Sequence, residues 1–129
     1  MVGMVIVSHS KKAAEGIYEL AMQMAGDNKK VVACGGMEDG SIGTDAVRIM
    51  NAIMEANDGD GVAILCDLGS GILSTQTAID LLEEPIEVKI ADAPILEGAI
   101  SAAITASFGS SLDEVIEAAE LAKTMSKLN

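Results

Sequence analysis

The strongest constraint on the fold of this chain is its alternation of short, β-branched apolar runs with longer amphipathic stretches. The runs at residues 2–7, 30–34, 61–66 and 86–90 predict four strands. The first three are apolar almost throughout, which is typical of strands covered on both faces. Because helical stretches separate the strands with short connections, we expect right-handed crossovers. We predict one α/β domain over residues 1–129, with a doubly wound, mostly parallel sheet of order 2-1-3-4 and helices on both faces.

The first three stretches between the strands carry apolar residues at helical spacing. The inward face of the first predicted helix consists of Ala13, Ile17, Leu20, Ala21 and Met24. That of the second consists of Ala46, Ile49, Ile53 and Met54. We expect Thr44 to cap this second helix. The third helix is predicted over residues 72–83 and stops before Pro85, with an inward face of Thr75, Ala78, Ile79 and Leu82.

The fourth helix is predicted from near Pro94, a residue suited to a first helical turn, to about Ser107. Apolar residues surround most of this helix, namely Ile95, Leu96, Ala99, Ile100, Ala102, Ala103, Ile104 and Ala106. Because a helix packed on a sheet needs only one apolar stripe, we expect a second covered side and a homodimer built partly on this helix.

The last helix is predicted to begin with a capping box at residues 111–114, Ser-Leu-Asp-Glu. Its inner face would consist of Leu112, Val115, Ile116 and Ala119. Lys123 and Lys127 suit the negative end of its dipole.

Charge and composition limit the partners of the chain. It carries 8 basic and 20 acidic residues, a formal net charge of −12. This field repels nucleic acid and anionic membranes and attracts a basic protein. An acidic excess that serves only solubility is an equally good interpretation. One tyrosine, one phenylalanine and no tryptophan leave no aromatic platform for bases or sugars. We therefore expect neither a nucleic-acid nor a membrane partner.

The cysteines and the N-terminus point to an intracellular domain. Cys34 and Cys66 lie inside apolar runs, which favours small buried thiols over a disulfide or a metal pair. With no CxxC motif and a single histidine, no metal site is expected. The N-terminal apolar stretch is about six residues long and lacks a cationic flank, so we expect neither a signal peptide nor a membrane span. Cytoplasmic localisation is the expectation.

The predicted topology locates the candidate site. In doubly wound sheets, ligands bind beyond the carboxyl ends of the strands, where the strand order reverses. Here that reversal falls between the first and third strands, which are followed by His9 and Asp67. A carboxylate beside an imidazole fixes the tautomer and leaves the other ring nitrogen free to attack. Histidine is a covalent nucleophile, and phosphorus is an electrophile suited to it.

A phosphoryl group on His9 would need donors for its oxygens. Ser70 and Gly71 lead into the third helix and Ser10 opens the first, so both helix starts offer backbone N–H groups to an anion. The connection at residues 35–44 contains four glycines, which indicates mobility or a close backbone approach to a ligand. A plain flexible connection is the alternative. From this loop, Gly36 and Thr44 are further candidates for phosphate binding.

Other phosphate chemistries lack their residues. Neither GxGxxG nor GxxxxGK[ST] is present. A receiver domain needs an acidic pair after the first strand to hold magnesium, and Ser8-His9 stands there instead. No serine lies on a nucleophile elbow, so Ser-His-Asp hydrolysis is not supported.

Three segments in order resemble a known family: residues 5–10 (VIVSHS), 36–44 (GMEDGSIGT) and 66–71 (CDLGSG). They are similar to DhaM, the phosphocarrier subunits of phosphoenolpyruvate-dependent dihydroxyacetone kinases. The fold of that family is the one of mannose-type enzyme IIA in the sugar phosphotransferase system. The resemblance covers nearly the whole chain, including the Ala-rich helix after Pro94.

The resemblance implies a phosphotransferase that works without a cofactor. Phosphorylated HPr would phosphorylate His9, and His9 would rephosphorylate ADP held in the nucleotide-binding kinase subunit. Asp67 matches the orienting carboxylate. The family also points to a homodimer. Some members append HPr-like and enzyme-I-like domains, and this chain is expected to use separate proteins. Enzyme IIA of a mannose-type sugar permease and a non-catalytic anion-binding module remain alternatives, and the phosphorylated ring nitrogen is left open.

Overall fold

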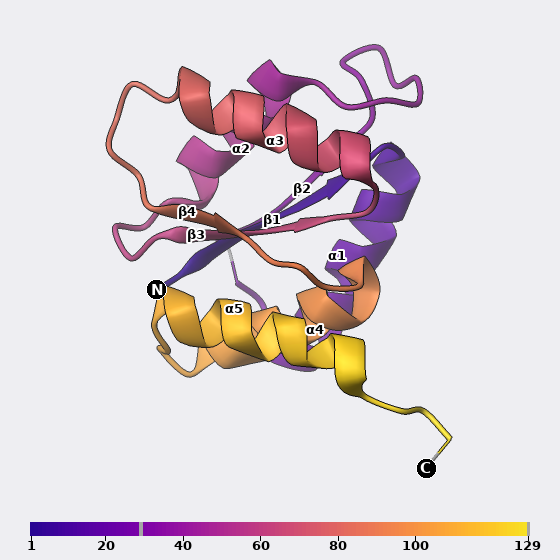
Figure 1. The fold of residues 1–129 in the computed structure, drawn as a ribbon, viewed down its shortest axis with the longest axis vertical. Coiled ribbons are helices and arrows are strands. Elements are labelled where there is room, and N and C mark those ends of the chain that lie inside the picture. The colour runs from indigo at the N-terminus through magenta and orange to yellow at the C-terminus, as the bar shows by residue number, and fades with distance from the viewer. Residues whose placement is uncertain (29, 129) are drawn as a thin grey trace.

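The computed structural model describes residues 1–28 and 30–128 and contains a four-stranded parallel sheet (Figure 1). The strand order β2-β1-β3-β4 confirms the predicted order 2-1-3-4. The strands are β1 (Gly3–Ser8), β2 (Val31–Gly35), β3 (Val62–Cys66) and β4 (Val88–Ile90). In the register that matters for the site, Val7 of β1 lies opposite Cys66 of β3. The residues that follow these two strands therefore leave the sheet side by side.

Helices cover both faces of the sheet, as predicted. They are α1 (Lys11–Ala25), α2 (Ala46–Ala56), α3 (Gly69–Leu81), α4 (Ile95–Ser107) and α5 (Leu112–Leu121), and the short 3₁₀ helix η1 (Ala122–Thr124) follows α5. Figure 1 shows α2 and α3 on one side of the sheet and α1, α4 and α5 on the other.

Two hydrophobic layers form because side chains alternate along each strand. On β1, Met4 and Ile6 belong to the layer under α1, α4 and α5, whereas Val5 and Val7 belong to the layer under α2 and α3. The other central strand, β3, divides its side chains in the same way. This two-sided burial accounts for the nearly continuous apolar runs of the central strands.

The apolar circumference of α4 has a cause within one chain. This helix lies between α1 and α5 and also packs on β1 and β3. Small side chains allow the close approach: a Cβ on Gly98 would lie 3.0 Å from side-chain atoms of Leu65 and Ala93. The buried residues of the helix are Gly98, Ala99, Ala102, Ala103 and Ala106. Neighbouring helices of the same chain therefore cover the flanks of α4.

Several local predictions are wrong. Ala13, Leu20 and Met24 of α1 are exposed, because the helix packs through the alanines Ala14 and Ala21. Small residues let the helix approach the sheet closely, and this turns the bulkier side chains outward. Met54 of α2 is likewise exposed.

Three predicted helix ends also differ. Asp45, not Thr44, caps α2, and its carboxylate accepts hydrogen bonds from the N–H groups of Val47 and Arg48. α3 begins three residues before the predicted start, at Gly69. α5 ends at Leu121, so Lys123 and Lys127 lie beyond it and pair with Asp92 and Glu97. The predicted capping box of α5 is confirmed.

Two further features concern the sequence predictions. Cys34 and Cys66 are free and buried, as expected, and burial raises the pKa of both thiols. Among the described residues, no helix combines the length and the apolarity that crossing a membrane requires.

Candidate functional site

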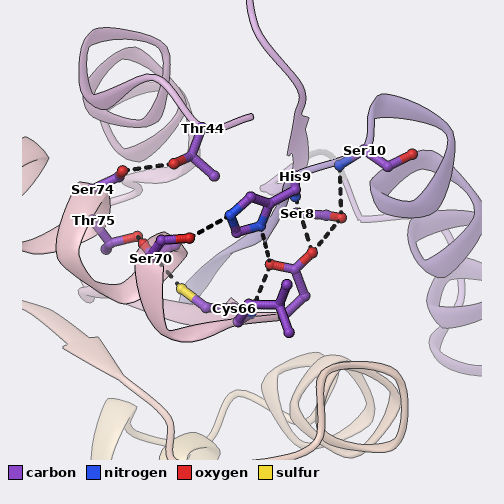
Figure 2. A network of polar contacts seen from close by, with 11 residues as sticks. Ser8, His9, Ser10, Thr44, Cys66, Ser70, Ser74 and Thr75 are labelled. Carbon is purple, nitrogen blue, oxygen red and sulfur yellow. Dashed lines mark hydrogen bonds and ion pairs between the residues drawn. The ribbon is translucent and has the colours of Figure 1, made fainter. Parts of the chain in front are cut away.

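The candidate site lies at the carboxyl edge of the sheet, where the strand order reverses. β1 ends at Ser8 and is followed by His9, and β3 ends at Cys66 and is followed by Asp67. Because β1 and β3 are paired neighbours, the structure brings these two side chains together. One ring nitrogen of the imidazole contacts Asp67. The other contacts Ser70 of α3 (Figure 2).

The hydrogen bonds of the ring distinguish its two nitrogens. His9 Nδ1 lies 2.9 Å from Asp67 Oδ1, and Nε2 lies 2.5 Å from Ser70 Oγ. An ionised carboxylate can only accept hydrogen bonds, so Nδ1 carries the ring proton and donates a hydrogen bond to Asp67. Nε2 is then unprotonated, and its lone pair accepts a hydrogen bond from the Ser70 hydroxyl. In this arrangement Nε2 is the ring nitrogen with the free lone pair, and the sequence left open which nitrogen would be phosphorylated.

Asp67 is held by four donors. Oδ1 accepts from His9 Nδ1 and from the Leu68 N–H at 2.8 Å. Oδ2 accepts from the Ser8 hydroxyl at 2.8 Å and from the His9 N–H at 3.0 Å. Partial burial alone would raise the pKa of Asp67, but the hydrogen bonds from His9, Ser8 and Leu68 outweigh it and hold that pKa below its ordinary value. The carboxylate therefore stays ionised at neutral pH.

Ser8 is a site residue that sequence reasoning missed. Its side chain is only 2% exposed, and its hydroxyl donates to Asp67 Oδ2 while accepting the N–H of Ser10 at 3.1 Å. This serine fixes the carboxylate that orients His9. The available signal was a polar residue at the end of an otherwise apolar buried strand, because such a residue needs a hydrogen-bond partner.

The start of α3 supplies donors beside Nε2. Because α3 begins at Gly69, the N–H groups of Gly69 and Ser70 belong to its first turn, and among the described residues neither donates to a backbone or side-chain acceptor. Gly71 adjoins the site, since a Cβ there would lie at the ordinary van der Waals distances of 3.5 Å from Asp67 Oδ1 and 3.8 Å from His9 Cε1. The positive end of the helix dipole and these N–H groups would favour an anion at this point.

The glycine-rich connection is tied to the site at both ends. The Gly36 N–H donates to the Ser8 carbonyl at 3.1 Å, and the Gly43 N–H donates to the His9 carbonyl at 2.9 Å. Gly36 has a φ of +70°, a conformation that favours glycine. Thr44 Oγ1 lies 2.6 Å from Ser74 Oγ, which joins this loop to α3 (Figure 2).

The five candidate phosphate-binding residues therefore differ in position. Ser70 and Gly71 adjoin the imidazole. Gly36 and Thr44 attach the glycine-rich loop to β1 and α3. Ser10 caps α1 by accepting the Ala13 N–H, and its side chain points away from the ring (Figure 2). Across residues 1–28 and 30–128, no group of three His, Cys, Asp or Glu side chains could hold a metal ion.

The fold agrees with that of the proteins to which the chain is similar. Residues 3–116 match the EIIA-man family, described as the PTS system fructose IIA component. The chain belongs to this family. It is 38% identical over 119 residues to PEP-dependent dihydroxyacetone kinase 2, phosphoryl donor subunit DhaM, of Listeria innocua, with 91% of this chain and 95% of that protein covered.

Longer relatives match over only part of their length. The chain is 42% identical over 127 residues to the phosphoryl donor subunit DhaM of the PEP-dependent dihydroxyacetone kinase of Providencia stuartii. The match covers 95% of this chain but only 27% of that protein. The chain thus spans about a quarter of that relative.

A solved structure supports the EIIA-man fold. Enzyme IIA of a phosphotransferase system from Streptococcus agalactiae superposes with a TM-score of 0.72 at 17% identity, with 98% of this chain and 97% of that chain covered. At this identity the likeness concerns the fold alone. A crystal structure of a protein of unknown function superposes with a TM-score of 0.80 at 36% identity, with 92% of each chain covered.

We expect Asp67→Asn to slow phosphorylation of His9 without abolishing it. An amide at this position must turn its NH₂ group either toward His9 and Leu68 or toward Ser8 and the His9 N–H, and it meets a backbone N–H in both cases. The ring then loses its fixed tautomer, and the rate should fall by on the order of 10²–10⁴-fold.

Labelling kinetics with phosphorylated HPr measure this rate, and ¹⁵N chemical shifts of the ring report the tautomer. Phosphate bound to Asp67 of the unaltered chain, rather than to His9, would contradict the assignment.

Proposed function

We propose that the chain is a phosphohistidine carrier. It accepts a phosphoryl group from HPr on His9 and passes it to ADP bound in the nucleotide-binding subunit of a dihydroxyacetone kinase. The observation that carries this proposal is the ring of His9, whose Nδ1 is held by Asp67 while Nε2 faces the start of α3. The DhaM relatives, described as phosphoryl donor subunits, support the choice of pathway.

In the accepting step, the lone pair of His9 Nε2 attacks the phosphorus of phosphorylated HPr. The new P–Nε2 bond forms as the P–N bond to the donor histidine breaks, and the bonding pair returns to that donor ring. His9 keeps its proton on Nδ1, and the ring gains positive charge. Asp67 stabilises this charge through the 2.9 Å hydrogen bond that already orients the ring.

Ser70 changes partners during this step. Its hydroxyl occupies Nε2 before transfer, so the side chain must rotate to admit the phosphorus. The hydroxyl can then donate to a phosphoryl oxygen, together with the N–H groups of Gly69 and Ser70 at the positive end of α3. The same groups that hold the resting ring thus receive the transferred group.

In the donating step, an oxygen of the β-phosphate of ADP attacks the phosphorus and the P–Nε2 bond breaks. The bonding pair returns to Nε2, so His9 regains the neutral tautomer with which it began. No proton has to enter or leave the site over the whole cycle. We propose a cytoplasmic location for this activity, because it uses ADP and phosphate from phosphoenolpyruvate.

A second candidate is enzyme IIA of a sugar permease, and the description of the matching family as the PTS system fructose IIA component favours it. Both candidates use His9 in the same way and differ in the acceptor. Discharge of the phosphorylated chain by the nucleotide-binding kinase subunit and ADP supports the kinase, whereas discharge only by permease components supports the sugar route.

We expect His9→Ala to abolish phosphoryl acceptance while the fold is kept, because the side chain is partly exposed and lies outside both hydrophobic layers. The assay incubates the chain with phosphoenolpyruvate, enzyme I and HPr and measures acid-labile, alkali-stable phosphate. Circular dichroism and the melting temperature control for folding. Labelling that persists in this variant would overturn the proposed function.

We expect acceptance from HPr to depend on salt. The net charge of −12 attracts a partner with basic residues around its site, and screening at about 0.1 M salt shortens this attraction to about 10 Å. The second-order rate should therefore fall as the ionic strength rises past that value. A rate that does not change with salt would assign the negative charge to solubility alone.

The local contribution is measured with Glu38→Lys in the exposed loop, which should slow acceptance. Asp39 is unsuitable for this test, because its carboxylate holds the loop through the N–H and hydroxyl of Ser41. Glu55→Lys makes the same charge change at the other end of β1, since the exposed Glu55 precedes Ala56, which packs against Gly3, and this variant serves as the control.

We also propose a homodimer built partly on α4. Because α1 and α5 cover the flanks of this helix, its apolar circumference does not by itself require a partner. The support for a dimer therefore comes from the family resemblance and from Ile100 and Ile104, which lie one turn apart and are partly exposed. Sedimentation at micromolar concentration should show a species of twice 13.2 kDa. A single species of 13.2 kDa would exclude the dimer.

A further inference from the structure

The outer edge of β2 carries backbone groups that point away from the sheet. β2 is the outermost strand in the order β2-β1-β3-β4, so only one of its sides is paired. The Met4 N–H donates to the Lys30 carbonyl at 2.9 Å, and in a parallel ladder the even-numbered residues that follow also face β1. The backbone groups of the odd-numbered residues Val31, Ala33 and Gly35 therefore point outward.

Several of these outward groups have no partner. The Val31 N–H donates to the Asn28 carbonyl at 3.3 Å. The Gly35 carbonyl accepts a hydrogen bond from the guanidinium of Arg48 at 3.2 Å. Among the described residues, nothing pairs with the N–H or the carbonyl of Ala33 or with the N–H of Gly35. An unpaired strand edge of this kind is a template for a further strand.

Two clefts border this edge, one on each face of the sheet. A cleft of about 520 Å³ lies between β2 and α1 and includes Glu15 and Glu19. A second cleft, of about 210 Å³, lies between β2 and α2 and includes Arg48. Both clefts include Val32 and Ala33, so they meet at the strand edge. Because successive side chains of a strand point to opposite faces, an added strand would place its side chains alternately in the two clefts.

The cleft on the α1 side is acidic. Glu15, Glu19 and Glu55 line it, and all three are exposed. Of the described residues, no Lys or Arg lines this cleft. Lys11 Nζ lies 4.0 Å from Glu15, and Lys30 Nζ donates to the backbone carbonyl of Glu55. The cleft therefore fits lysine or arginine side chains, whose aliphatic stems can cover apolar surface while their charged ends meet the carboxylates.

The cleft on the α2 side offers a hydrogen-bond donor. Arg48 donates to the Gly35 carbonyl, and its Nε is buried with no acceptor among the described residues. A guanidinium has several N–H donors, so this side chain is incompletely satisfied. Glu55 also lines the cleft and disfavours a second carboxylate there. An uncharged acceptor such as the amide of glutamine or asparagine therefore suits this side.

We propose that the edge of β2 binds an extended, basic segment of a partner protein, which adds a further strand to the sheet. Its lysine or arginine side chains alternate with amide side chains, the former over Glu15 and Glu19 and the latter beside Arg48. Because His9 follows β1 and contacts Asp67 after β3, a strand outside β2 leaves the imidazole open. The partner can stay bound while the candidate site reacts, so this inference goes beyond the proposed function.

A second copy of this chain is a poorer occupant of the edge. Two copies joined through antiparallel β2 strands about a two-fold axis would place α1 next to α1 of the other copy. The exposed Glu15 and Glu19 of both copies would then meet. The net charge of −12 on each copy adds to this repulsion, whereas a basic segment is attracted at the same positions.

The probe is a peptide of sequence KQKQKQK with blocked ends, titrated into the unaltered chain at low salt. Strand addition gives the N–H groups of Ala33 and Gly35 an acceptor, so their hydrogen exchange, followed by NMR, should slow by about tenfold at saturation. The N–H groups of Val32 and Cys34 already face β1, so their exchange should change less. The peptide EQEQEQE should not bind.

A double variant tests the acidic cleft. Glu15→Gln together with Glu19→Gln should weaken the binding of KQKQKQK by about fivefold, which is typical of the loss of two exposed ion pairs. Glu117→Gln is the matched control, because it makes the same change on α5, which packs on β3 and β4. This control should bind the peptide like the unaltered chain.

Methylation of alternate backbone nitrogens of the peptide separates strand addition from attraction of charge alone. Methyl groups on the nitrogens that face β2 remove the hydrogen bonds, whereas those on the other nitrogens point to solvent. In an antiparallel pair the residues that bond Ala33 share its face, so methylation at the lysines would abolish binding. In a parallel pair, methylation at the glutamines would do so. Only one of the two methylated peptides should therefore bind.

No binding of KQKQKQK, or equal binding of both methylated peptides, would overturn the proposal. An unchanged affinity in the double glutamine variant would do the same. If the amides of Ala33 and Gly35 are protected in the chain alone and lose this protection on dilution, β2 of a second copy occupies the edge and the proposal is wrong. Failure of the proposed function is distinct, because none of these measurements involves phosphoryl transfer.

Discussion

The candidate site depends on the hydrogen bonds of the Asp67 carboxylate, because they join the ends of two strands to the imidazole of His9. The carboxylate accepts hydrogen bonds from Ser8 and His9 at the end of β1 and from Leu68 before α3. These bonds form only if β1 and β3 are neighbours, so the strand order is a condition for the tautomer of His9. The fold and the candidate nucleophile are thereby connected through one side chain.

The negative charge of the proposed phosphoryl group would be balanced by groups next to it, because the chain as a whole is acidic. A net charge of −12 disfavours an anion, yet the proposed phosphoryl position lies at the positive end of the α3 dipole with the N–H groups of Gly69 and Ser70. Dipole effects extend over about one turn, so they act on the phosphoryl group and not on a distant partner. The overall field then remains available for attraction of a basic protein over longer distances.

The sequence was sufficient for the sheet order and for the meeting of His9 and Asp67, because both follow from which strands are apolar and where they end. It was insufficient where neighbouring residues could each make the same local contact. Asp45 instead of Thr44 caps α2, since a carboxylate reaches two backbone N–H groups there. The start of α3 was predicted too late because Gly69 and Gly71, which are poor helix formers, lie in its first turn. Ser8 was missed because its partner lies 59 residues away in the chain.

A carrier must hold its phosphoryl group without trapping it, and the distribution of cations fits that requirement. Among residues 1–28 and 30–128, no Lys or Arg makes a hydrogen bond or ion pair with His9, Asp67 or Ser70, and the cations that are paired contact carboxylates or carbonyls elsewhere. Neutral donors bind a phosphoryl group more weakly than a bidentate guanidinium does. The proposed phosphohistidine would thus stay reactive, because the described site holds no cationic clamp, and the partner's own basic residues would complete the charge balance only during transfer.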